Sequence, residues 1–126
     1  MSGIKPHFTA AKRAGDYIFV SGQLPFDQDM KIVKGGIEIQ TRVVINHIAQ
    51  ALENIGSDLS HVVKTMVWLT NPDDFPAFNA SYAEFFQENP PARATVGSTL
   101  MVTGALIEIE AIAFHPLQPA TKAAAE

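Results

Sequence analysis

One arginine, Arg93, lies in a stretch of small and apolar residues, "NPPARATVGS", that spans positions 89–98. This stretch contains no acidic residue that would neutralise the arginine. Because a guanidinium keeps its proton in a protein, Arg93 must meet water, an acid from elsewhere in the chain, or an anionic ligand. Arg93 is therefore a candidate carboxylate-binding residue.

Glu108 is the first acid of a predicted strand, "ALIEIEAIAF", that spans residues 105–114. If the strands of Arg93 and Glu108 are neighbours in the sheet, the two side chains can approach each other. One interpretation is a structural ion pair. The other is a site in which Arg93 grips a carboxylate through a two-pronged charged hydrogen bond, leaving Glu108 to handle a proton or a water. Residue types alone leave both interpretations open.

Other polar residues give weaker signals. Ser21 precedes Gly22 without a Gly-x-Ser-x-Gly elbow around it, so we do not expect a serine hydrolase. Asn79 lies at the edge of an apolar helical pattern, where an asparagine usually packs. The chain has no cysteine, and its histidines lack i, i+4 spacing, so we expect no metal site. These histidines are His7, His47, His61 and His115.

Hydrophobic periodicity predicts the elements that position these residues. A helix begins at Ile37 and stops at Gly56, and a second helix carries the aromatic residues between Phe75 and Phe86. The predicted strands are an edge strand before residue 16, a strand over 17–21, a short strand within 25–36, and strands at 61–70, 93–98 and 105–114. This order predicts an α+β fold, a sheet with both helices on one face.

The last strand has apolar side chains on both of its faces. One face carries Ile107, Ile109, Ala111 and Ala113, and the other carries Glu108, Glu110, Ile112 and Phe114. Two helices on one side cannot cover the second face. A small domain usually covers such a face with another subunit, so we infer an oligomer.

Composition limits the class of protein. The chain has 126 residues, 47% of them hydrophobic and 17% charged, which suits a single globular domain. No apolar run approaches a signal peptide or a membrane span, and the absence of cysteine is compatible with a reducing cytoplasm, where we expect the protein. The formal net charge of −4 disfavours a nucleic-acid partner.

Four sequence blocks carry a resemblance to a known family. "VSGQLP" (20–25), "NASYAEFF" (79–86), "PARATV" (91–96) and "IEIEAIA" (107–113) resemble, in order and spacing, the RidA/YjgF family of reactive intermediate deaminases, also called endoribonuclease L-PSP. The resemblance covers residues 5–115, and we expect the tail at 116–126 to fray. It implies a chorismate-mutase-like α+β domain that forms a homotrimer, with active sites between subunits.

The resemblance also implies roles for single residues. Arg93 matches the arginine that binds the substrate carboxylate, and Glu108 matches the glutamate that positions a water or assists protonation. The matching pocket residues are Ser21, Gly22, Asn79 and Thr95, the last through its backbone. Two stretches depart from the family pattern: His7 stands in place of a tyrosine, and "LMVTGA" (100–105) replaces a Leu-Pro turn. Both departures indicate a different pocket.

The reaction implied is hydrolysis of an enamine or imine of a 2-oxo acid, such as 2-aminoacrylate or 2-iminopropanoate, to the oxo acid and ammonia. No metal or organic cofactor is required. Three alternatives remain: a pathway-specific deaminase of a 2-aminomuconate-like compound, a non-catalytic trimer that binds a small carboxylate, and a ribonuclease or translation inhibitor. The negative net charge counts against the last of these.

Overall fold

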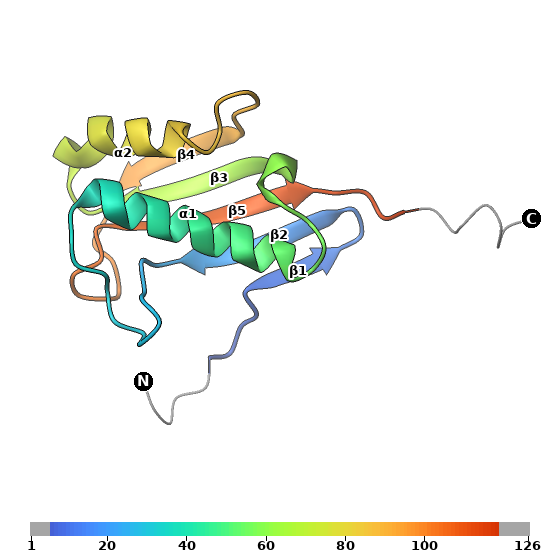
Figure 1. Cartoon of the computed structure of the whole chain (residues 1–126), viewed down its shortest axis with the longest axis horizontal. Helices are drawn as coiled ribbons and strands as arrows, with labels where there is room; N and C mark the ends of the chain where they lie inside the picture. Colours follow the sequence, from blue (N-terminus) through green and yellow to red (C-terminus); the bar gives the residue numbers. More distant parts are fainter. Residues whose placement is uncertain (1–5, 119–126) are drawn as a thin grey trace, which may run out of the picture.

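A five-stranded mixed sheet carries two helices on one of its faces (Figure 1). The computed structural model describes residues 6–118. The strands lie in the order β1-β2-β5-β3-β4, in which β3 and β4 are parallel and the other neighbours antiparallel. The elements are β1 (Ala11–Ala14), β2 (Tyr17–Gln23), α1 (Ile37–Glu53), η1 (Leu59–His61), β3 (Val62–Leu69), η2 (Pro72–Asp74), α2 (Phe75–Ala83), β4 (Ala92–Gly97) and β5 (Ile107–Phe114).

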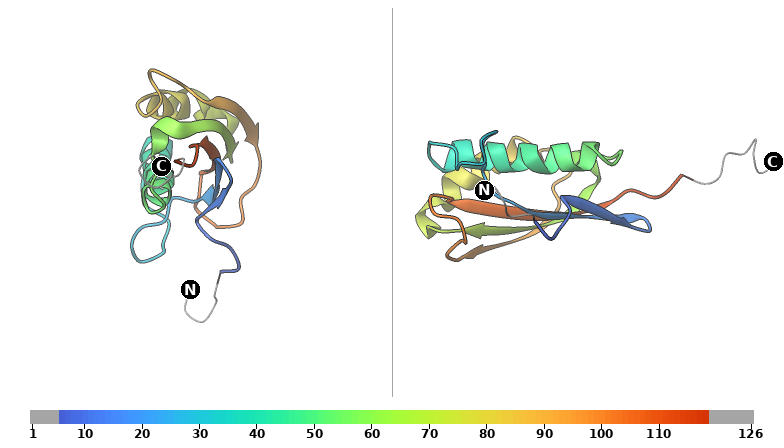
Figure 2. Two further views of the ribbon diagram at one scale, coloured as in Figure 1. Left: turned by 90° about the vertical axis from the view of Figure 1, so that its right-hand side faces the viewer. Right: turned by 90° about the horizontal axis from the view of Figure 1, so that it is seen from below.

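Both helices lie above the same face of the sheet when the molecule is viewed along its edge (Figure 2). This arrangement confirms the predicted α+β fold. The first helix forms as its apolar spacing predicts, with Val44, Ile48 and Leu52 buried against the sheet. It ends before Gly56, whose φ of +84° favours glycine. Ile55, which the helix predicted to run up to Gly56 would include, lies beyond the end of α1 and is 36% exposed.

The short strand predicted within residues 25–36 is wrong. This segment is a loop with one isolated bridge between Phe26 and Ile32. The Asp27 side chain accepts hydrogen bonds from the amides of Asp29 and Lys31, at 2.8 and 3.0 Å, and folds the chain back on itself. The Asp27 side chain therefore stabilises a turn here, and the segment does not pair as a strand.

The second helix is shorter than its aromatic pattern predicts. The repeat of aromatic residues continues to Phe86, but α2 ends at Ala83. The amides of Phe85 and Phe86 bond to the carbonyls three residues back, on Tyr82 and Ala83, so the last turn is tightened. Phe86 is still buried, because the tightened turn keeps its ring on the packed side.

The alternation predicted for the last strand is confirmed, although β5 begins two residues later than expected. The face of β5 that carries Ile107 and Ile109 lies under the helices, and both side chains are fully buried. The other face of the sheet stays open and exposes Tyr17, Phe19 and Phe114 at 45%, 47% and 41%. The oligomer inferred from this pattern remains a prediction. No helix within residues 6–118 is long and apolar enough to span a membrane.

Candidate active site

Arg93 projects from the edge strand β4 toward α2. Its guanidinium carbon lies over three aromatic rings, 5.7 Å from the centre of Phe75, 5.2 Å from Phe78 and 4.8 Å from Tyr82. The ion pairs found among residues 6–118 do not include Arg93. Within residues 6–118, Arg93 therefore forms no structural ion pair. The faces of the three aromatic rings stabilise its charge instead.

The aromatic residues of α2 form this platform because their spacing places them on one side of the helix. Phe78 packs against Tyr82 with ring centres 5.3 Å apart. The hydroxyls of Tyr82 and Thr65, on the neighbouring strand β3, lie 2.7 Å apart and share a hydrogen bond. Burial raises the pKa of Tyr82, so its hydroxyl remains neutral. The platform is thus packed and hydrogen-bonded beneath Arg93.

A groove of about 610 Å³ opens beside Arg93. Apolar walls lower the local dielectric and strengthen a guanidinium–carboxylate bond, while the Asn79 amide offers a second polar contact. The structure therefore brings two predicted site residues, Arg93 and Asn79, into one groove. Its lining residues are Asn79, Tyr82, Ala83, Phe86, Gln87, Pro90, Pro91 and Arg93.

Thr95 follows Arg93 by two residues, so it shares the same face of β4. Its hydroxyl oxygen is buried and has no hydrogen-bond partner among the described residues. A smaller cavity of about 220 Å³ lies next to it and also contacts Phe75, one of the rings beneath Arg93. Thr95 is therefore near Arg93 and carries an unused hydrogen-bonding group.

Glu108 lies on a different part of the molecule, directly against Gly22. A Cβ atom added to Gly22 would be 2.3 Å from Oε2 of Glu108, so glycine lets the carboxylate take this position, and a larger residue would displace it. The strands β2 and β5 lose their regular register between Val20 and Gln23, which is where Gly22 lies. Burial raises the pKa of Glu108, and the nearby charge of Glu110 adds to this effect.

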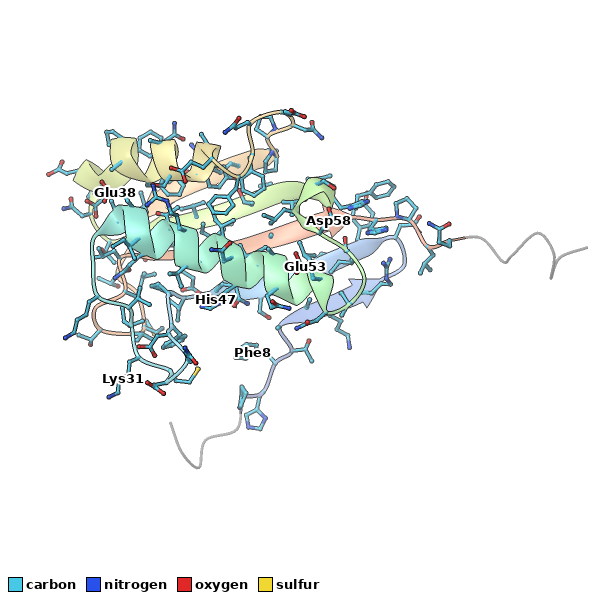
Figure 3. The ribbon with its side chains drawn as sticks, in the orientation of Figure 1. Phe8, Lys31, Glu38, His47, Glu53 and Asp58 are labelled. Atoms are coloured by element: carbon cyan, nitrogen blue, oxygen red, sulfur yellow. The ribbon has the colours of Figure 1, made fainter. Side chains whose placement is uncertain are left out.

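Ser21 joins the same region through the segment that precedes β1. Its hydroxyl donates to the carbonyl of Thr9 at 2.6 Å, and its amide donates to the carbonyl of Ala10. A cavity of about 400 Å³ lies beside Ser21, and Phe8 contributes to its wall. Figure 3 shows Phe8 on the segment leading into β1, far from α2. His7 is exposed and does not line this cavity.

Phe8, which the sequence did not single out, is thus the residue of this stretch that lines the cavity, whereas His7 does not. The signal that could have indicated Phe8 is that it is the aromatic residue of the stretch "KPHF" (5–8). His7 remains a predicted site residue, but within one chain the structure gives it no contact with the other candidates.

Arg93 and Glu108 do not approach each other within one chain, because their strands are not neighbours in the sheet. Strand β3 lies between β4 and β5. Arg93 pairs in register with Thr65, a buried residue whose side chain faces the helices. Glu108 pairs with Trp68, and its neighbours along β5 are the residues buried beneath the helices, so Glu108 itself points to the other face. The two side chains therefore lie on opposite faces of the sheet. The candidate residues of one chain therefore fall into two separate groups, one around Arg93 and one around Glu108, and each group is called a half-site.

Three of the histidines take part in local contacts. A ring nitrogen of His47 bonds to the carbonyl of Phe26 at 2.8 Å. His61 and His115 stack with ring centres 3.7 Å apart, a pairing that their sequence spacing did not indicate. Within residues 6–118, no group of three or more His, Cys, Asp or Glu side chains is arranged to hold a metal ion.

Comparison with known proteins places the chain among relatives of one kind. The family model described as "Endoribonuclease L-PSP" matches residues 3–115. A RutC family protein of Pyrococcus horikoshii is 43% identical over 108 residues, which cover 85% of this chain and 86% of the relative. Protein HMF1 of Saccharomyces cerevisiae is 37% identical over 106 residues, covering 84% of this chain and 82% of that protein.

Solved structures show the same fold. The crystal structure of a putative endoribonuclease from Thermotoga maritima matches with a TM-score of 0.84 and 36% identity, over 91% of both chains. The YjgF gene product of E. coli matches with a TM-score of 0.80 and 31% identity, over 90% of this chain and 91% of that one. Both identities are high enough to indicate common descent as well as a shared fold.

Proposed function

Because the chain belongs to the endoribonuclease L-PSP family, also known as RidA/YjgF, we propose that it hydrolyses enamines and imines of 2-oxo acids to the oxo acids and ammonia. The observation that carries this proposal is Arg93, a cation without an acidic partner among residues 6–118, fixed over three aromatic rings beside an open groove. Such a group suits the carboxylate of a 2-imino acid.

The chemistry needs little from the protein beyond positioning. The carbon of an imine is already electrophilic, so no nucleophilic side chain has to attack it. The enzyme must hold the carboxylate, place a water near the carbon, and exchange a proton with carbon or nitrogen. Arg93 performs the first task. Glu108 performs the proton or water step, and its raised pKa supports this role because a carboxyl that titrates closer to neutrality exchanges protons more readily.

A complete site requires two subunits. Arg93 and Glu108 lie on opposite faces of the sheet in one chain, so the half-site of one subunit must face the second half-site of another. The open face of the sheet exposes Phe19 and Phe114, which supports such an assembly. We therefore propose a homotrimer in which Arg93, Asn79 and Thr95 come from one subunit, and Ser21, Gly22 and Glu108 come from its neighbour.

The first experiment measures hydrolysis of imino acids that an amino acid oxidase generates in place. Arg93→Ala removes about two charged hydrogen bonds of roughly 1.5–3 kcal/mol each, so kcat/KM is expected to fall by roughly 100-fold or more. Arg42→Ala serves as the matched control, because Arg42 forms an exposed pair with Glu84 and lies outside the groove. The control should keep full activity.

Two results would change the conclusion. If the folded wild type does not accelerate hydrolysis of any imino acid but binds pyruvate through Arg93, the protein is a carboxylate-binding protein. If Arg93→Ala hydrolyses imines as fast as the wild type, Arg93 does not hold the substrate. A set of imino acids with different side chains also tests whether the protein prefers small substrates or a bulkier, pathway-specific one.

A further inference from the structure

One glutamine side chain, Gln40, is almost fully buried in α1, with only 2% of its surface exposed. A buried amide is costly unless its polar atoms are paired. Gln40 meets this condition through three backbone groups. Its Oε1 accepts from the amide of Leu106 at 2.8 Å, and its Nε2 donates to the carbonyls of Gly104 at 3.1 Å and Val33 at 3.4 Å.

These bonds hold the segment that connects the two half-sites. The chain leaves β4, which carries Arg93, and enters β5, which carries Glu108, through residues 98–106. The amide of Leu106 is bonded to Gln40, and its carbonyl accepts from the amide of Thr70. Leu106 is therefore fixed on both sides at the point where the loop becomes a strand.

Glu108 follows Leu106 by two residues, so the start of β5 sets the position of its backbone. Its carboxylate packs against Gly22 so closely that an added Cβ would be 2.3 Å from Oε2. A shift at the start of β5 would therefore move the carboxylate relative to Gly22. Arg93 depends on other contacts, the rings of α2, and would not follow such a shift.

We propose that Gln40 is a positioning residue, which fixes Glu108 by clamping Leu106 and Gly104 at the start of β5. The inference rests on the proposed function for its effect on turnover, but not for its effect on Glu108 itself. Gln40 touches neither substrate half-site. It acts through the backbone, so its loss should affect the step that uses Glu108 and leave carboxylate binding at Arg93 unchanged.

The test is Gln40→Met, which keeps the length of the side chain and removes all three hydrogen bonds. We expect kcat to fall by about tenfold, as for a small displacement of a catalytic group, while the dissociation constant for pyruvate stays within about twofold. Thr41→Val is the matched control. Thr41 is the next residue, is equally buried, and has a hydroxyl without a partner among residues 6–118, so its removal should change neither quantity.

A readout without activity separates this inference from the proposed function. NMR titration of the Glu108 carboxyl should show a shifted midpoint in Gln40→Met and an unchanged midpoint in Thr41→Val. If the wild type hydrolyses no imine but the Glu108 midpoint still shifts, the proposed function fails and the positioning role stands. If a folded Gln40→Met keeps the wild-type midpoint, the positioning role is wrong.

Two further results would overturn the inference. An equal loss of kcat and of pyruvate affinity would show that Gln40 only stabilises the fold. If Gln40→Met does not fold, hydrogen exchange in the wild type decides: the Leu106 amide should be protected far more than that of Met101, which is 90% exposed in the same loop. Equal exchange at both amides would show that the clamp is not formed.

Discussion

Gly22→Ala tests the close packing of Glu108 most sharply. The added Cβ would be 2.3 Å from Oε2 of Glu108, whereas ordinary contacts begin at 3.4 Å, so the carboxylate must move by about 1 Å. Gly22 does not have a positive φ, so the new side chain adds no backbone strain. A displacement of about 1 Å at a catalytic group can reduce a rate by roughly 100-fold, and we expect that loss in kcat.

The assay measures the initial rate of ammonia release from imino acids generated in place. Pyruvate affinity should change little, because Arg93 holds the carboxylate and rests on the rings of α2, which Gly22→Ala does not contact. Gly36→Ala is the control, since its Cβ would meet only the flexible end of Glu38 at 3.4 Å. A Gly22→Ala protein with the wild-type rate would refute the reasoning, because Glu108 would then tolerate displacement or take no part in the reaction.

Two further predictions concern the platform and the acid. Tyr82→Phe keeps the ring beneath Arg93 but leaves the buried Thr65 hydroxyl without its partner, so chemical denaturation should show a loss of about 1–2 kcal/mol while pyruvate affinity is unchanged. Lost affinity would mean that the hydroxyl, not the ring, supports Arg93. Glu108→Gln should be more stable than the wild type at neutral pH and equal to it well below pH 4.5, the ordinary carboxyl value, because the raised pKa of Glu108 makes its ionisation unfavourable in the folded protein. The wild type therefore loses stability relative to Glu108→Gln as pH rises from the ordinary carboxyl pKa to the raised pKa of Glu108. Thermal unfolding of both proteins across pH 3–8 measures this difference. A difference in melting temperature that does not change with pH would contradict the prediction.

Local patterns predicted the elements well where the signal lay within a short stretch. The alternation around Glu108 gave the correct inner and outer faces of β5, and Gly56 marked the end of α1. The failed strand within 25–36 shows the limit of this approach. A stretch with alternating apolar and polar residues can also form a turn. Asp27 folds this loop through hydrogen bonds from its side chain to the backbone, and the hydrophobic pattern does not indicate such bonds.

The strand order was the part that the sequence could not supply. Strand β5 inserts between β2 and β3, a pairing of residues far apart in the chain, and nothing near Arg93 or Glu108 indicates it. This order is what separates the two residues. Gln40 escaped notice for a similar reason, because its partners Gly104 and Leu106 lie more than 60 positions away.

The central claim, that Arg93 of one subunit works with Glu108 of another, is tested most directly by mixing two inactive proteins. Arg93→Ala and Glu108→Gln are refolded together in equal amounts so that their subunits assemble at random. A site between subunits then receives an intact Arg93 and an intact Glu108 in about a quarter of cases, and about a quarter of wild-type activity should return. If both residues act within one subunit, every site lacks one of them, and the mixture would remain as inactive as its components.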